Sequence, residues 1–129
     1  MYKYSKTSAD RLATCHVDLQ LLFNELSKDW DISIICGNRS EEVQNAAVAA
    51  GNSKTTFPNS KHNSTPSMAV DAALYPVDWY DNGRNYIFVG IVKQVAKELG
   101  IGIRCGADWD GDNITSDQTF DDIVHFELI

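Results

Sequence analysis

A carboxylate in the middle of an apolar strand is the feature that most constrains this chain of 129 residues. The segment 68–74 reads Met-Ala-Val-Asp-Ala-Ala-Leu, which is typical of a buried strand, and Asp71 is at its centre. A buried carboxylate is costly unless it is paired or binds a metal. Because side chains alternate across a strand, we expect Asp71 to share a face with Ala69 and Ala73, which leave room beside it.

Two histidines are candidates to bind a metal together with this carboxylate. His62 lies in a polar loop before Asp71, and His125 lies in an apolar stretch near the C-terminus. Two imidazoles and a carboxylate suit a catalytic zinc, which keeps a fourth position open for water, whereas a structural zinc needs four protein ligands. Asp122 is a spare carboxylate that could move protons, and Glu127 could orient a ligand.

Hydrophobic periodicity predicts helices mixed with a small sheet. We expect helices at 9–26, 41–50 and 84–99, and strands at 31–36, 68–74, 101–104 and 123–128. The polar stretches 52–66 and 106–121 read as loops. We therefore expect one α+β domain over residues 1–129, with a mostly antiparallel sheet packed against about three helices and the metal cleft on the open face of the sheet.

Composition excludes several classes of protein. The net charge of −7 and the lack of a Lys/Arg cluster argue against a nucleic-acid partner. No stretch approaches the roughly 18 apolar residues of a membrane span, and the N-terminus does not resemble a secretory signal, so we expect synthesis in a cytoplasm. Three cysteines favour reduced thiols: Cys15 and Cys36 are expected to be buried, and Cys105 is a less favoured extra ligand.

Short motifs occur along most of the chain in a distinctive order. They are Gly37-Asn38-Arg39-Ser40, Ser60-Lys61-His62-Asn63, Pro66 to Asp71, Tyr75 to Trp79, Gly106 to Trp109 and His125 to Leu128. Their joint order and spacing resemble the zinc peptidases that cut peptidoglycan peptides, which include D-alanyl-D-alanine carboxypeptidases and phage L-alanyl-D-glutamate endopeptidases. Eight residues separate His62 from Asp71, and this long, proline-containing gap resembles the phage branch. Cys105 and Ala107 stand where that branch often has Trp and Gly, a departure at the floor of the expected cleft.

The resemblance implies a specific set of site residues. The positions that bind zinc in the family fall on His62, Asp71 and His125. The family's general base lies three residues before the last histidine, which is Asp122 here. Sequence proximity alone does not separate Asp122 from Asp121, and Asp122 reaches the metal only if the chain turns before the last strand.

Four further residues are candidates for binding substrate. The family places a substrate-facing arginine at the position of Arg39; the alternative is a surface arginine that pairs with Glu42. Ser60 either forms a hydrogen bond with the substrate or with a metal ligand, or is an ordinary loop serine without a role. Gln44 either lines the cleft or lies on its helix surface, and Trp109 either forms a wall of the cleft or packs in the core.

The loop 106–121 is acidic. Its aspartates are Asp108, Asp110, Asp112 and Asp117. A solvated acidic loop is the favoured interpretation, and a calcium site is the alternative, because alternating aspartates supply hard oxygen ligands. The loop lacks the glycine and the final glutamate that an EF-hand requires.

The function that the resemblance implies is hydrolysis of an amide bond in the peptidoglycan stem peptide, by a zinc metallopeptidase. We expect a phage endolysin that cuts the L-alanyl-D-glutamate bond, acts as a monomer, does not insert into the membrane and reaches the cell wall after release by a membrane-permeabilising partner. The alternatives are a D-alanyl-D-alanine carboxypeptidase and a non-catalytic, metal-bearing module that binds peptide.

Overall fold

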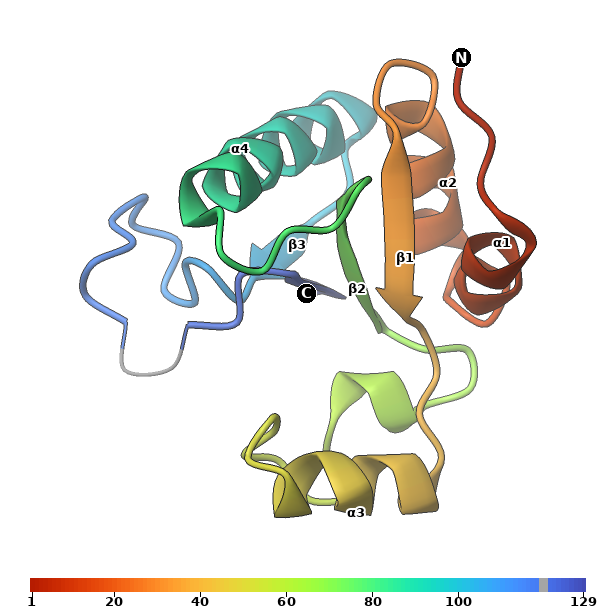
Figure 1. The fold of residues 1–129 in the computed structure, drawn as a ribbon, viewed down its shortest axis with the longest axis vertical. Coiled ribbons are helices and arrows are strands. Elements are labelled where there is room, and N and C mark those ends of the chain that lie inside the picture. The colour runs from red at the N-terminus through yellow and green to blue at the C-terminus, as the bar shows by residue number, and fades with distance from the viewer. Residues whose placement is uncertain (119–120) are drawn as a thin grey trace.

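A four-stranded antiparallel sheet organises the structure, a computed structural model that describes residues 1–118 and 121–129 (Figure 1). The strands are β1 (Ile32–Cys36), β2 (Ala69–Leu74), β3 (Ile103–Cys105) and β4 (His125–Leu128), in the spatial order β1-β2-β4-β3. The described helices are α1 (Lys6–Leu12), α2 (Val17–Leu26), α3 (Glu41–Ala49) and α4 (Asn82–Leu99), with a 3-10 turn, η1 (Lys61–Asn63). The expected α+β class and the antiparallel sheet are confirmed.

The apolar core lies between the sheet and the helices α1, α2 and α4. Phe126 of β4 is at its centre, and its ring makes edge-on contacts with Phe23 of α2 and Phe88 of α4, at centroid distances of 5.8 and 6.0 Å. Such an aromatic pair contributes about 0.5–1.5 kcal/mol beyond the burial of area. Helix α3 and η1 lie instead beyond the end of β1, at the bottom of Figure 1. We call residues 41–63, which contain both, the lip.

The single helix expected at 9–26 is wrong, because the structure divides it into α1 and α2. Between them the chain runs beside Ser67: His16 N donates to the carbonyl of Ser67 (2.8 Å), and Ser67 N donates to the carbonyl of Thr14 (2.9 Å). The His16 side chain then caps α2 by accepting from Asp18 N (3.0 Å). The apolar period continues across the break, and no glycine or proline marks it, so periodicity alone predicts one helix.

The last strand is shorter than expected, since β4 begins at His125 rather than at 123. A turn precedes it, closed by His125 N donating to the carbonyl of Asp122 (3.0 Å). This is the turn that a base at Asp122 requires. None of the described helices is long and apolar enough to cross a membrane.

Gly37 links the core to the lip and tolerates no side chain. A Cβ at Gly37 would overlap Thr14 Oγ1 and the carbonyl oxygen of Arg11, which belong to α1 and the segment after it. Gly90 is the contrasting case, because a Cβ there, on the exposed side of α4, would meet nothing.

We therefore expect opposite effects from two Gly→Ala substitutions. Gly37→Ala should lower the free energy of unfolding by about 1–3 kcal/mol, the usual cost of overpacking. Gly90→Ala should raise it by about 0.5–1 kcal/mol, because alanine favours the helix. Urea unfolding followed by circular dichroism measures both, and equal effects from the two changes would contradict this account of Gly37.

Candidate metal centre and active site

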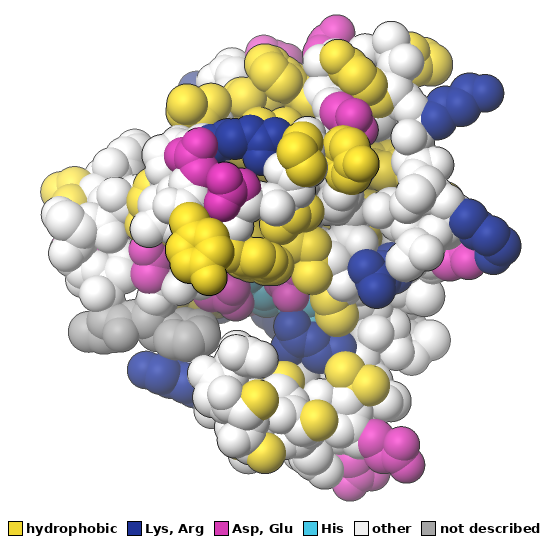
Figure 2. All heavy atoms as spheres, in the orientation of Figure 1, with side chains coloured by type: hydrophobic (Ala, Val, Ile, Leu, Met, Phe, Trp, Pro, Cys, Tyr) yellow, Lys and Arg dark blue, Asp and Glu magenta, His cyan; other side chains and the backbone are white. Residues whose placement is uncertain are grey.

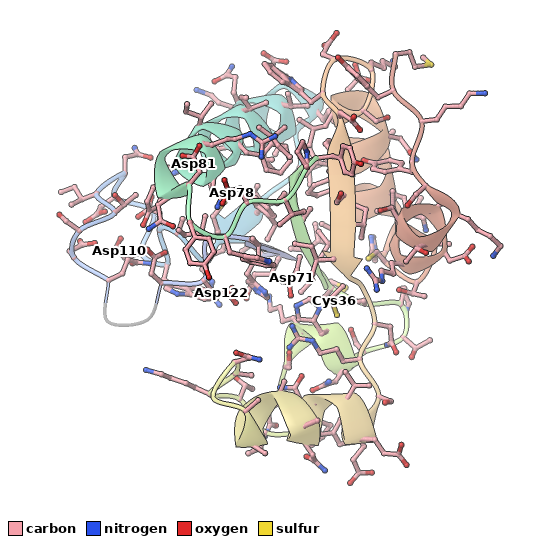
Figure 3. The ribbon with its side chains drawn as sticks, viewed as in Figure 1. Cys36, Asp71, Asp78, Asp81, Asp110 and Asp122 are labelled. Atoms are coloured by element: carbon pink, nitrogen blue, oxygen red, sulfur yellow. The ribbon has the colours of Figure 1, made fainter. Side chains whose placement is uncertain are left out.

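The register of the sheet brings Asp71 and His125 face to face. Asp71 in β2 pairs directly with His125 in β4, and with Cys36 in β1 on its other side. Residues that are directly opposite in an antiparallel pair point to the same face. Asp71 and His125 are only 5% and 7% exposed, so two ionisable groups meet at a buried position. Figure 3 shows Asp71 and Cys36 near the lower ends of their strands.

The η1 turn delivers His62 to the same place. Ser60 caps this turn by accepting from His62 N (3.2 Å), and Asn63 Oδ1 accepts from Ser60 N (3.0 Å). The His62 ring is buried, and its Nδ1 donates to the carbonyl of Gly37 (2.7 Å). Because a carbonyl can only accept, Nε2 is the nitrogen without a proton in the neutral ring, and it faces Asp71 and His125.

Three ligand atoms form a nearly equilateral triangle. His62 Nε2, Asp71 Oδ1 and His125 Nδ1 are each 3.2 Å from the other two. Ligands about 2.0–2.1 Å from a tetrahedral zinc ion are roughly 3.3 Å apart, so this spacing and this N/N/O donor set fit zinc. The three residues that the sequence singled out as ligands are therefore brought together.

Glu127 holds the His125 ring in this orientation. His125 Nε2 donates to Glu127 Oε1 (2.9 Å), which leaves Nδ1 for the triangle. The other oxygen, Oε2, lies 2.9 Å from Arg104 Nη2 and 3.4 Å from Lys61 Nζ. Burial raises the pKa of Glu127, but the bonds from His125 and Arg104 outweigh burial and lower it to about 2. Glu127 is thus a charged anchor for a ligand, as metal sites commonly use.

Asp71 is ionised at neutral pH, as a metal ligand must be. Burial alone would raise its pKa, but the hydrogen bonds from His125 and His62 more than offset burial and hold the pKa well below its usual range. Burial lowers the pKa of His62, and Asp71 and Cys36 reverse this and raise it to about 9. Binding of a metal to this set therefore displaces protons from the imidazoles.

Asp122 lies at the edge of the triangle, and its neighbour points elsewhere. Asp122 Oδ2 is 4.0 Å from His125 Nδ1, whereas the exposed Asp121 accepts a hydrogen bond from Tyr86 of α4. Burial raises the pKa of Asp122, and the charge of Asp71 raises it further. A carboxyl group with a raised pKa inside a cleft is suited to accept and return a proton.

Arg39 turns inward instead of lying on the surface. Its Nη2 donates to Asp71 Oδ2 (2.8 Å), and its Nε donates to Cys36 Sγ (3.3 Å). Its backbone N donates to the carbonyl of His62 (2.7 Å). One arginine therefore contacts both the Asp71 ligand and the segment that carries the His62 ligand, with its side chain 15% exposed to the cleft.

Gln44 is fully buried behind Arg39, so it lies neither in the cleft wall nor on the surface of its helix, the two places that the sequence left open. Its Oε1 accepts from Arg39 Nη1 (3.3 Å), and its Nε2 donates to Ser53 Oγ (3.0 Å) and to the carbonyl of Thr55 (2.6 Å). Gln44 thus ties α3 to the loop that follows it and orients Arg39. It lies outside the reach of a substrate in the cleft.

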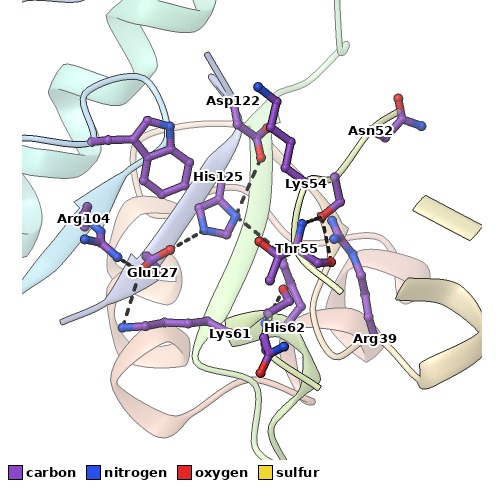
Figure 4. A pocket seen from close by; sticks show the side chains of 14 residues that line it. Arg39, Asn52, Lys54, Thr55, Lys61, His62, Arg104, Asp122, His125 and Glu127 are labelled. Carbon is purple, nitrogen blue, oxygen red and sulfur yellow. Dashed lines mark hydrogen bonds and ion pairs between the residues drawn. The ribbon is translucent and has the colours of Figure 1, made fainter. Parts of the chain in front are cut away.

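A cleft of about 290 Å³ opens above the triangle, between the lip and the ends of β3 and β4 (Figure 2). Ser60 and Trp109 both line it, and the Trp109 ring lies 5.3 Å from the His125 ring. Figure 4 shows Arg104, Glu127 and Lys61 on one side of His125 and Arg39 on the other. Trp109 is therefore a wall of the cleft, and Ser60 both caps η1 and lies on the cleft surface.

One cysteine differs from the expectations. Cys36 is half-buried rather than buried, and its thiol lies within 4.8 Å of ligand atoms of His62 and Asp71. Burial raises the pKa of this thiol, but His62 and Arg39 outweigh burial and lower it. Cys105, for which a ligand role was the less favoured alternative, is buried in the apolar core.

The acidic loop gathers carboxylates away from the triangle. One ligand atom each from Asp108, Asp110 and Asp112 lies within 4.8 Å of the others. Asp108 is buried, and its Oδ2 accepts from Lys93 Nζ (3.0 Å) and Asn113 N (2.9 Å). Residues 119 and 120 of the expected loop lie outside the described residues. The calcium alternative stays a prediction.

Several residues of the cleft gave no signal in the sequence. Lys61 and Trp79 lie inside the quoted motifs without an assigned role, and Arg104 lies outside those motifs. They come from three different segments, and only the tertiary structure brings them to one cleft. For Arg104 the missing information was the sheet order, because it places β3 beside β4, which carries His125 and Glu127.

Comparisons with known proteins agree over the whole chain. A family model described as phage L-alanyl-D-glutamate peptidase matches residues 1–129. The L-alanyl-D-glutamate peptidase of Escherichia phage T5 is 33% identical over 139 aligned positions, which cover 99% of this chain and 98% of that protein. The crystal structure of the L-Ala D-Glu endopeptidase ChiX of Serratia marcescens matches with a TM-score of 0.76 and 26% identity, over 98% of this chain and 90% of that one. This chain therefore belongs to the phage L-alanyl-D-glutamate peptidase family.

Proposed function

We propose that this chain is a zinc-dependent endopeptidase that hydrolyses the L-alanyl-D-glutamate bond of the peptidoglycan stem peptide. The observation that carries the proposal is the triangle of His62 Nε2, Asp71 Oδ1 and His125 Nδ1 at the base of an open cleft. The family membership of the chain supports both the peptidase activity and the peptidoglycan substrate.

The residues around the triangle supply the rest of the chemistry. A bound zinc ion would polarise the scissile carbonyl. It would also lower the pKa of the water bound to it, so that hydroxide is available at neutral pH. Asp122 takes the proton of the attacking water and passes it to the leaving amine. Arg39 keeps Asp71 in place and offers positive charge to the oxygen on which negative charge develops. Glu127 keeps His125 oriented throughout.

The shape of the cleft favours an endopeptidase over a carboxypeptidase. Hollows continue on both sides of Asp122, one towards Arg104 and the other towards Trp79. A substrate can therefore extend past the scissile bond in both directions, whereas a carboxypeptidase needs only a short pocket beyond that bond. A non-catalytic binding module would have no use for the half-buried Asp122 at the triangle. We further propose that the protein acts as a monomer on the cell wall after its release, because one chain supplies every residue of this site.

Digestion of purified peptidoglycan tests the reaction itself. We expect mass spectrometry of the digest to find new amino-terminal D-Glu, because the cleft accommodates peptide on both sides of the bond. Release of free D-Ala would instead establish the carboxypeptidase, and an unchanged sacculus would contradict both enzymes.

Removal of the metal tests the cofactor. We expect a chelator to abolish cleavage, and added zinc or cobalt to restore it. His62→Ala, Asp71→Ala and His125→Ala should each lose bound zinc, measured by atomic emission on the purified protein, because each change removes one of three ligands. His16→Asn is the matched control: it changes the remaining histidine, keeps a helix cap and should retain one zinc per chain. Full zinc content in the His125→Ala protein would refute the ligand assignment.

The two neighbouring aspartates give a sharp test of the general base. Asp122→Asn should lower the rate on the order of 10²–10⁴-fold, because the amide cannot accept the proton. Zinc content and melting temperature should stay unchanged, since the three ligands remain. Asp121→Asn, which alters only the exposed contact with Tyr86, should have a mild effect. A dead Asp121→Asn enzyme beside an active Asp122→Asn enzyme would move the base by one residue.

A further inference from the structure

The two ends of the cleft have different chemistry. The hollows on either side share Arg39, Asn52 and Asp122. At the end towards β3, the lining adds the cations Lys54, Lys61 and Arg104, together with the half-buried Trp109, whose ring lies under the Arg104 guanidinium (5.7 Å to the centroid). At the end towards β1, the lining adds the apolar side chains Ile35, Trp79 and Val124. The strand order β1-β2-β4-β3 puts these two ends on opposite sides of the Asp71–His125 pair.

The end towards β3, the cationic end, suits a substrate that carries carboxylates. At this end, the buried carboxylate of Glu127 pairs with both Lys61 and Arg104. With the shared residues included, four cations (Arg39, Lys54, Lys61 and Arg104) line this end against the two carboxylates of Asp122 and Glu127. This end is therefore positive, although the chain as a whole has a charge of −7. The side chains of Lys61 and Arg104 are 40% and 49% exposed, so they face the cleft as well as Glu127. The local charge therefore opposes the charge of the rest of the molecule and selects an anionic ligand.

The end towards β1, the aromatic end, presents an exposed indole on a fixed loop. Trp79 is 58% exposed and lies between β2 and α4. Arg84 of α4 holds this loop by donating to the carbonyls of Leu74 (3.3 Å), Tyr75 (3.0 Å) and Pro76 (2.6 Å). A second cavity beside it is lined by Trp79 together with Asp122 and Val124. Trp79 is therefore an exposed indole on a backbone segment tied to α4, and it lines the same hollows as Asp122.

The proposed substrate has the same asymmetry, and this step depends on the proposed function. The L-Ala residue is attached directly to the muramic acid sugar of the glycan strand, so a sugar lies one residue from the bond to be cut. The D-Glu residue continues through its side-chain carboxyl, which leaves its α-carboxylate free beside that bond. One half of the substrate is thus a glycan, and the other half is an anionic peptide.

We propose that Trp79 stacks on the sugar that precedes L-Ala, while Lys54, Lys61 and Arg104 bind the carboxylates of D-Glu and of the residues after it. The negative face of an indole ring attracts the C–H groups on the face of a pyranose ring, and the ring offers a large apolar area. Charge complementarity sets the direction in which the substrate lies, because the cations that can pair with its anionic half line the end towards β3. The stem peptide therefore crosses the sheet from β1 to β3, with the glycan at the aromatic end.

Two soluble substrates that share the scissile bond test this direction. One is a disaccharide-linked stem peptide, and the other is the same peptide without sugar. Trp79→Ala should raise KM about fivefold on the sugar-bearing substrate, the size of one aromatic stacking contact, with kcat unchanged. It should leave KM for the sugar-free peptide unaltered, and Trp79→Phe should recover most of the loss. Tyr80→Ala is the matched control, because Tyr80 is the neighbouring residue, is 97% exposed and should affect neither substrate.

The opposite end is tested with the same pair of substrates. Lys54→Gln should raise KM for both by the same factor, because both carry the anionic half, and the effect should fade with added salt. Lys97→Gln, an exposed cation of α4 outside the cleft, should change neither. An equal effect of Trp79→Ala on both substrates, or a Lys54→Gln effect confined to the sugar-bearing one, would overturn the proposed direction. A wild-type enzyme that releases no amino-terminal D-Glu from either substrate would instead overturn the proposed function.

Discussion

A carboxylate held between two imidazoles inside a sheet is the interaction on which this structure depends. Asp71 is 5% exposed, and a lone ion in that position would cost several kcal/mol per charge. Its two oxygens are instead divided between partners: Oδ1 faces His62 and His125 at 3.2 Å, and Oδ2 accepts from Arg39 at 2.8 Å. The arrangement satisfies the carboxylate and at the same time leaves three ligand atoms converging on one point. Stability of the sheet and readiness for a metal therefore have the same physical cause.

The surrounding residues act on the orientation of these groups. The Gly37 carbonyl sets the tautomer of His62, and Glu127 sets the tautomer of His125, so each ring turns its other nitrogen to the centre. These two anchors come from opposite sides, one at the end of β1 and the other on β4. The lip depends on the first anchor, because the segment around His62 is tied to Gly37 and to Arg39 N. Correct folding of the lip thus completes the ligand set.

The order of the strands determines which residues line each end of the cleft. An edge strand on one side, β3, carries Arg104, and the edge strand on the other side, β1, carries Ile35. Between them, the central strands β2 and β4 carry Asp71 and His125. A reaction centre on the two inner strands, flanked by unlike outer strands, gives an extended substrate two distinguishable ends. Specificity in such a site follows from the difference between those ends as much as from the metal.

The sequence by itself determined the α+β class and the place of Asp71 in a buried strand, because local periodicity and an isolated charge in an apolar segment are readable without neighbours. The family followed from the order and spacing of the short motifs, which resemble those of known peptidases. It also singled out His62 and His125 as partners, but not the nitrogen of each ring that faces the centre. The break between α1 and α2, the inward turn of Arg39 and the burial of Gln44 depended on contacts between distant segments. The family resemblance had pointed to Asp122 rather than Asp121, and the tertiary structure gives the physical difference: a backbone turn sends Asp122 towards His125 and Asp121 towards Tyr86. Alternation along a strand cannot predict that turn, because the strand begins only at His125 and the turn before it is closed by hydrogen bonds from His125 N to the Asp122 carbonyl and from Asp122 N to the distant Gly106 carbonyl.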